Sequence, residues 1–283
     1  MPDDTSPDNA ILDFSHAGLL ITAHGSPSTS GGRASSRKHA QTIRGLDLFA
    51  DVQTGFLTEK PFVKDVLDAM IVPEVYVVPN LACAGYISTN KLPQALSLTG
   101  QVTERITPQG HQRVFLTDPV GTDPHLPKML ATRIDAAIKD LDVDADEAAI
   151  VLIGHGSQKS RASFEHTEQI ARDLNRQNLG APLATAYLEE PPYIKDWTTL
   201  TQATTVVFVP FLISDGYHGA NEIPQDIGFD PKGPGFQDRL AQVQPNVMER
   251  NGRRLIYLPP IGDAPEMSEL ILNRARAAKS EYA

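Results

Sequence analysis

Two histidines and a glutamate follow three separate apolar segments of the sequence, and together they have the chemistry of a metal site. His155 comes directly after residues 150–154, His218 lies beyond residues 206–211, and Glu189 ends a third apolar segment. Neutral imidazole binds Fe²⁺, Co²⁺, Ni²⁺ and Zn²⁺, and it accepts protons near neutral pH. A carboxylate completes a ligand set or accepts a proton. We therefore predict that these three residues form one catalytic and metal-binding site, with their individual roles unassigned.

The apolar segments that precede these residues are predicted to be buried β-strands. Residues 150–154 and 206–211 are almost continuously apolar, which is typical of strands covered on both faces of a parallel sheet. Residues 126–139 and 163–175 instead place apolar side chains at the spacing of a surface helix. This pattern predicts an α/β fold, in which the carboxyl ends of parallel strands form the ligand crevice.

The sequence also contains an internal duplication. Residues 19–26 recur as residues 150–157, and both copies end in His-Gly-Ser at a separation of 131 residues. Further along, residues 112–121 match residues 253–262 at a separation of 141 residues. The second copy therefore contains about ten additional residues, which we place in the Gly- and Pro-rich stretch 228–235.

The two copies differ at the candidate site. The first copy has a histidine, His24, at the position of the first site histidine. Ile87 and Thr58 stand where the second copy has its other histidine and its glutamate. We therefore predict a single site per chain, located in the second copy, while the first copy forms part of the wall of the cleft and helps to set its shape.

The duplication defines the expected domains. Residues 1–16 form an N-terminal tail, residues 17–145 form a first α/β half with a degenerate site, and residues 146–283 form a second α/β half with the active site. The boundary is placed in the acidic stretch 142–147, which lacks large apolar residues.

Several motifs of the second copy, taken in order, resemble the class II chelatases, and most closely the sirohydrochlorin cobaltochelatase and ferrochelatase family. They are residues 154–157 (Gly-His-Gly-Ser), 186–189 (Ala-Tyr-Leu-Glu), 209–212 (Val-Pro-Phe-Leu), 216–218 (Gly-Tyr-His) and 222–224 (Glu-Ile-Pro). The resemblance implies two flavodoxin-like halves with parallel sheets facing a central cleft. It also implies a lyase that inserts Co²⁺ or Fe²⁺ into a tetrapyrrole for cobalamin or sirohaem biosynthesis. By position, His155 and His218 match the active-site histidines of the family, and Glu189 matches its acidic residue.

The implied substrate, sirohydrochlorin or a related tetrapyrrole, carries carboxylates, so cations and polar side chains near the site are candidates for binding it. The candidates follow the two His-Gly-Ser segments and the predicted strand ends: Ser26, Asn90, Ser157, Lys159, Arg161 and Tyr217. For each cation, a solvated helix end is an equally good interpretation. The divalent metal, Co²⁺, Fe²⁺ or Ni²⁺, is a substrate, and no other cofactor is expected.

Composition excludes several other functions. The formal net charge is −10, which argues against nucleic-acid binding because that needs a basic surface. The single cysteine, Cys83, allows neither an internal disulfide nor a cysteine metal cage. We find no apolar run of about 18 residues and no signal-like N-terminus, so no membrane association and a cytoplasmic location are expected.

Two other functions are compatible with the same residues. The first is a carrier that binds a tetrapyrrole or a metal without catalysis. The second is a hydrolase with Ser157 as nucleophile, although the Gly-x-Ser-x-Gly context of a nucleophile elbow is absent. The sequence does not choose the metal, the macrocycle or the oligomeric state.

Overall fold

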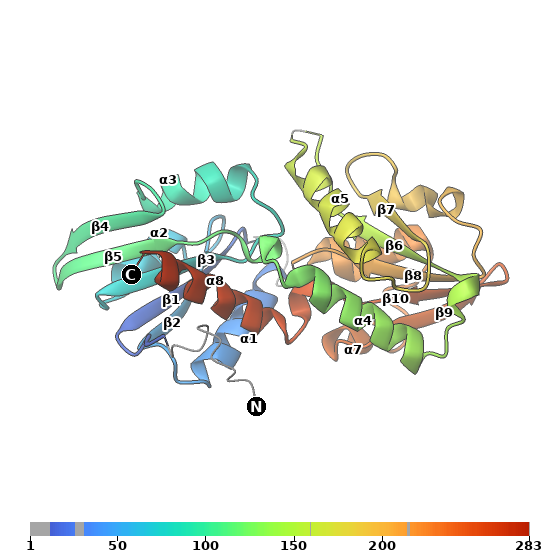
Figure 1. The fold of residues 1–283 in the computed structure, drawn as a ribbon, viewed down its shortest axis with the longest axis horizontal. Coiled ribbons are helices and arrows are strands. Elements are labelled where there is room, and N and C mark those ends of the chain that lie inside the picture. The colour runs from blue at the N-terminus through green and yellow to red at the C-terminus, as the bar shows by residue number, and fades with distance from the viewer. Residues whose placement is uncertain (1–11, 26–30, 159, 214–215, 283) are drawn as a thin grey trace, which may run out of the picture.

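The computed structural model describes residues 12–25, 31–158, 160–213 and 216–282 (Figure 1). Within them the first sequence copy contains β1 (Ala17–Ala23), α1 (Gly31–Arg44), β2 (Asp51–Phe56), α2 (Val63–Ala69), β3 (Glu74–Pro79), α3 (Leu92–Leu96), β4 (Val102–Thr107), β5 (Gly110–Leu116) and α4 (Leu126–Asp140). The second copy contains β6 (Ala148–Gly154), α5 (Ala162–Asn175), β7 (Leu183–Tyr187), β8 (Thr205–Pro210), α6 (Ile223–Ile227), α7 (Phe236–Ala241), β9 (Asn246–Arg250), β10 (Arg253–Tyr257) and α8 (Met267–Tyr282). The predicted α/β fold with two similar halves is confirmed.

Each half is built on one five-stranded sheet, with the order β2-β1-β3-β5-β4 in the first and β7-β6-β8-β10-β9 in the second. Four strands of each sheet are parallel, as predicted, whereas the edge strands β4 and β9 run antiparallel to their neighbours. A two-residue loop explains this difference, because only antiparallel strands can be joined so tightly. In the second half this loop is Asn251-Gly252, and both residues have the positive φ of a type I′ turn.

The additional residues of the second copy form a short helix and the loop that precedes it. Helix α7 lies between α6 and β9, whereas the first half passes from α3 to β4 without a corresponding helix in the described residues. Phe236 and Leu240 of α7 are buried in the core of the second half. The insertion therefore extends the hydrophobic core of this half.

The two halves exchange their last helices. Helix α4 follows the first sheet in sequence but packs against α5 of the second half, and α8 packs against α1, β3 and β5 of the first half. Figure 1 shows this exchange, with the green α4 beside the second sheet and the red α8 beside the first. The sequence repeat therefore ends after α4, whereas the packing links each half to the last helix of the other.

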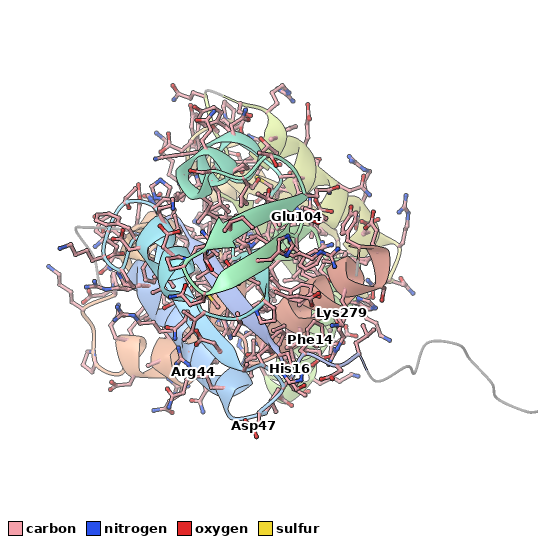
Figure 2. The ribbon with its side chains drawn as sticks, turned by 90° about the vertical axis from the view of Figure 1, so that its left-hand side faces the viewer. Phe14, His16, Arg44, Asp47, Glu104 and Lys279 are labelled. Atoms are coloured by element: carbon pink, nitrogen blue, oxygen red, sulfur yellow. The ribbon has the colours of Figure 1, made fainter. Side chains whose placement is uncertain are left out.

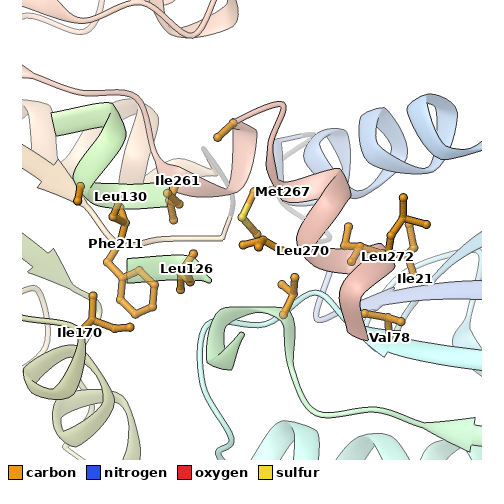
Figure 3. Close-up of a cluster of buried hydrophobic side chains, with 14 of the residues drawn as sticks. Ile21, Val78, Leu126, Leu130, Ile170, Phe211, Ile261, Met267, Leu270 and Leu272 are labelled. Atoms are coloured by element: carbon orange, nitrogen blue, oxygen red, sulfur yellow. The ribbon is translucent and has the colours of Figure 1, made fainter. Parts of the chain in front are cut away.

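This exchange produces one hydrophobic core that is shared by both halves (Figure 3). Leu130 of α4 lies with Ile170 and Phe211 of the second half, and Leu272 of α8 lies with Ile21 of the first half. All five side chains are buried. Since each exchanged helix would expose an apolar face if the halves separated, this core holds the two sheets together.

The outer end of α8 is also anchored on the first half. The Nζ atom of Lys279 lies 5.1 Å from the ring centroid of Phe14 and 3.6 Å from a carboxylate oxygen of Glu74. Figure 2 shows Lys279 and Phe14 next to each other at this end of the molecule. No helix in the described part of the chain is both long and apolar enough to cross a membrane.

A buried histidine of the first half forms hydrogen bonds with the segment that follows the second sheet. His39 of α1 donates from Nε2 to the carbonyl oxygen of Gly262 (2.7 Å), which follows the second sheet, and its Nδ1 atom lies 3.0 Å from the hydroxyl of Ser268. A second histidine, His166 of α5, donates to the carbonyl oxygen of Gly121 (2.9 Å) after the first sheet. Burial lowers the pKa of His39 below the ordinary value of 6.5.

This lowered pKa makes the stability of the fold depend on pH. The unfolded chain binds a proton at His39 more readily than the folded chain, so unfolding is favoured as pH falls below 6.5. We expect the free energy of unfolding, measured in urea, to fall between about pH 7.5 and about pH 5.5. The decrease should be smaller in His39→Gln, which retains a hydrogen-bond donor without a titratable ring. An equal decrease in both proteins would contradict this assignment.

Candidate active site

A cleft of about 1460 Å³ lies between the halves at the carboxyl ends of the central strands. Its walls come from both halves: the first half contributes His24, Asn80 and Tyr86, and the second contributes His155 and His218 among others. A crevice in this place is expected for open parallel sheets, because the loops after neighbouring strands diverge there. The two predicted histidines therefore lie in this cleft between the halves.

The two histidines of the second half face each other. His155 follows β6, and His218 opens the π-helical turn η6 (His218–Glu222) after the adjacent strand β8. Their ring centroids are 5.0 Å apart and the rings are nearly perpendicular, at 85°. Both side chains are partly buried. The sequence prediction that these imidazoles converge at one sheet edge is confirmed by this geometry.

Hydrogen bonds set the orientation of both rings. The Nδ1 atom of His155 lies 3.0 Å from the carbonyl oxygen of Gly156, and Nδ1 of His218 lies 2.5 Å from Oε2 of Glu222. A carbonyl or carboxylate oxygen can only accept, so Nδ1 is the protonated nitrogen in both rings. In the neutral form of each ring, Nε2 then carries the lone pair and is the atom available as metal ligand or proton acceptor.

The turn that carries His218 is attached to the sheet beneath it. The hydroxyl of Tyr257 on β10 is fully buried and donates to the carbonyl oxygen of Gly219 at 2.7 Å. Glu222 at the end of the same turn is followed along the chain by Asp226 of α6. Burial, and then the charge of Glu222, raise the pKa of Asp226. The Tyr257 hydroxyl thus holds the backbone of this turn, and the Glu222 carboxylate holds the His218 ring.

Glu189 lines the same cleft but lies at its exposed margin. Its backbone N–H donates to the carbonyl oxygen of His155 at 3.0 Å, which fixes the two segments side by side. The described residues contain no group of three or more His, Cys, Asp or Glu side chains that could hold a metal ion. The structure therefore brings the histidine pair together, and a direct role of Glu189 in metal binding stays a prediction.

Two further carboxylates support the site in roles that were not predicted from the sequence. Glu190 accepts a hydrogen bond from the backbone N–H of Ser157 at 2.8 Å and so secures the His-Gly-Ser turn, and Glu222 holds His218 as described above. The sequence contains a feature that indicates each of these two supporting carboxylates. Glu222 follows His218 by four residues on a helical turn, and Glu190 has a glutamate, Glu59, at the equivalent position of the first copy.

Within the described residues, only some of the predicted substrate-binding residues are found in the lining of the cleft. Ser157 and Tyr217 line the cleft. Arg161 and Asn90 are exposed and are not among the described residues that line it; the guanidinium of Arg161 lies 4.5 Å from the Phe164 ring centroid. Ser26 and Lys159 lie outside the described residues.

The described cleft walls have little basic character. They contain histidines, hydroxyl groups and many apolar side chains, but no lysine or arginine within the described ranges. Leu81 and Ile87 of the first half and Phe211 and Leu212 of the second are examples of the apolar lining. Such a surface suits the apolar face of a ring system better than it suits a cluster of anionic groups.

Two α/β halves that enclose a histidine-containing cleft between their strand ends agree with the architecture that the resemblance to the class II chelatases implies. The family model CbiX matches residues 18–137 and 149–278. These two matches cover most of the chain and coincide with its two sequence copies. The chain therefore belongs to the CbiX family.

Individual relatives agree with this assignment. The chain is 25% identical to the probable sirohydrochlorin cobaltochelatase of Halobacterium salinarum (strain NRC-1) over 273 residues, which cover 92% of this chain and 91% of the relative. SirB from Bacillus subtilis, solved with Fe³⁺, has a TM-score of 0.67 and 21% identity, with 94% of this chain and 97% of that chain covered.

A larger protein contains the same fold. DR2241 from Deinococcus radiodurans, a multi-domain protein with structural similarity to chelatases, matches with a TM-score of 0.66 and 23% identity. The match covers 92% of this chain but only 54% of DR2241, so the chain spans about half the length of that protein. Both solved structures establish a shared fold.

Proposed function

We propose that this protein is a sirohydrochlorin chelatase, which inserts Co²⁺ or Fe²⁺ into a tetrapyrrole for cobalamin or sirohaem biosynthesis. The observation that carries the proposal is the pair His155 and His218, whose rings lie 5.0 Å apart in the cleft with their Nδ1 atoms bonded to protein acceptors. Membership of the CbiX family and the cobaltochelatase name of the Halobacterium relative support this substrate class.

The reaction replaces two pyrrole N–H protons of the free macrocycle with one divalent metal ion, so two protons leave for each metal inserted. The metal must also exchange its water ligands for other donors before it reaches the macrocycle. The Nε2 atoms of His155 and His218 supply such donors and can accept protons near neutral pH. Glu189, at the exposed margin, is proposed to pass protons to solvent or to complete the ligand set.

The metal is a substrate in this scheme, and we propose no additional cofactor. The apolar walls are proposed to cover the macrocycle face, while the carboxylates of sirohydrochlorin remain in water at the cleft mouth. This arrangement avoids burying anionic groups in a cleft whose described lining has no lysine or arginine.

Metal insertion into metal-free sirohydrochlorin, followed by absorbance, tests the proposal directly. We expect the purified protein to accelerate insertion of Co²⁺ or Fe²⁺ above the rate without protein, and assays with Co²⁺, Fe²⁺ and Ni²⁺ in parallel will rank the metals. A protein that binds sirohydrochlorin but accelerates insertion of none of these metals would instead be a tetrapyrrole carrier. A lack of both binding and acceleration would reject the proposed substrate.

A further inference from the structure

Two exposed tyrosines occupy equivalent positions in the two halves, and both line the cleft. Tyr86 of the first half and Tyr217 of the second stand 131 residues apart, which is the repeat distance of the sequence. Their side chains are 65% and 52% exposed, and both line the cleft. Each directly precedes a π-helical turn: η2 (Ile87–Lys91) after Tyr86 and η6 after Tyr217.

The backbone holds the two tyrosines in the same way. Tyr86 has φ −49° and ψ −34°, and Tyr217 has φ −63° and ψ −39°, so both lie in the right-handed helical region. A Cβ atom at Gly85 would lie 3.9 Å from Cβ of Ala162, which begins α5. The segment with Tyr86 therefore reaches across to the second half, close to the chain that follows the His155 turn.

The first half retains the aromatic residue in the cleft but lacks most of the residues proposed to bind the metal. The first half has Ile87 in place of the second-half histidine and Thr58 in place of Glu189, so it lacks two of the three candidate chemical groups. It nevertheless presents Tyr86 in the cleft with most of the ring exposed to solvent. An exposed aromatic side chain in a cleft indicates a ligand contact, because it contributes little to the core.

We propose that Tyr86 is a substrate-binding residue, whose ring stacks on the flat face of the tetrapyrrole from the first half while Tyr217 contacts the macrocycle from the second half. This inference rests on the proposed chelatase function and adds a specific task for the degenerate half. Offset stacking on an aromatic ring suits a conjugated macrocycle and needs no positive charge. The histidine pair remains in the second half, so Tyr86 acts on binding and leaves metal transfer to that pair.

The test compares binding and turnover in Tyr86→Ala, Tyr86→Phe and Ile106→Ala. The probe is metal-free sirohydrochlorin, and its Kd is measured by fluorescence titration without metal. We expect Tyr86→Ala to raise Kd and KM for sirohydrochlorin roughly 5- to 10-fold, as loss of one aromatic contact does, with kcat changed less than about 2-fold. Tyr86→Phe retains the ring and should bind like the wild type.

Ile106 is the matched control, because its side chain is 81% exposed on edge strand β4 and does not line the cleft. Ile106→Ala should leave Kd, KM and kcat unchanged. Thermal unfolding of all three variants checks that each is folded.

The outcomes distinguish this inference from the chelatase proposal. Unchanged Kd and KM in Tyr86→Ala, with normal metal insertion by the wild type, would overturn the role of Tyr86 and leave the chelatase intact. Equal weakening by Tyr86→Phe and Tyr86→Ala would overturn stacking, because it would assign the contact to the hydroxyl group. A wild type that neither binds sirohydrochlorin nor inserts a metal would overturn the proposed function, and the stacking role with it.

Discussion

Replacing His218 with alanine is expected to lower kcat/KM for metal insertion at least about 100-fold, while the protein stays folded. The substitution removes one of the two imidazoles that meet in the cleft, and the remaining ring, His155, cannot supply two donors. Because the His218 side chain is only partly buried, its loss leaves a solvent-accessible gap and no closed cavity in the core. Absorbance assays with metal-free sirohydrochlorin and the preferred metal will measure the change.

Two further variants test the role of Glu222 and the assignment of the site to the second half. Glu222→Gln keeps an acceptor for Nδ1 of His218 but removes the charge, so a smaller loss of about 10-fold is expected. His24→Ala changes the equivalent histidine of the first half, which lines the same cleft without a second imidazole at position 87, and should retain most of the metal-transfer rate. If His24→Ala lost as much activity as His218→Ala, the site could not be assigned to the second half alone.

Much of the fold could be predicted because its signals are local. The apolar runs at residues 150–154 and 206–211 correspond to β6 and β8, and the helical spacing at residues 163–175 corresponds to α5. The antiparallel edge strand β9 also had a local signal, the Asn251-Gly252 dipeptide, which the prediction of parallel sheets did not use.

The exchange of α4 and α8 had no comparable signal. An amphipathic helix shows in its sequence that it buries one face, but it does not show which sheet it covers. Leu130 of α4 and Leu272 of α8 would satisfy the same pattern on either half. The choice depends on the direction of the chain as it leaves β5 and β10, which is a property of the tertiary structure.

The candidate site was predictable to the extent that it depends on strand ends. His155 and His218 follow adjacent parallel strands, so their convergence follows from the topology. Glu189 follows the edge strand β7, which pairs with β6 and not with β8, and its side chain lies at the exposed margin. Sequence patterns place a residue at the sheet edge but do not give the depth of its side chain in the cleft.

Gly262 is in close backbone contact with residues 212 and 213, which precede His218 in the sequence. The N–H of Gly262 donates to the carbonyl oxygen of Leu212 at 2.9 Å, and its own carbonyl accepts from His39 and Ser35. A Cβ atom at this glycine would lie 1.7 Å from the carbonyl oxygen of Ile213. No side-chain rotation can relieve this overlap, because the backbone fixes the position of Cβ and the carbonyl oxygen is itself a backbone atom.

We therefore expect Gly262→Ala to destabilise the protein by about 3 kcal/mol or more, at or above the upper end of overpacking effects. Urea unfolding will measure this, with Gly100→Ala as control, because a Cβ at that exposed glycine has only an ordinary contact with the Val102 carbonyl oxygen at 3.8 Å. The protein that remains folded should also insert metal more slowly, since residues 212 and 213 must shift and they precede His218 by only a few residues in the sequence. Wild-type stability and wild-type rate in Gly262→Ala would show that this loop can move without disturbing the histidine pair.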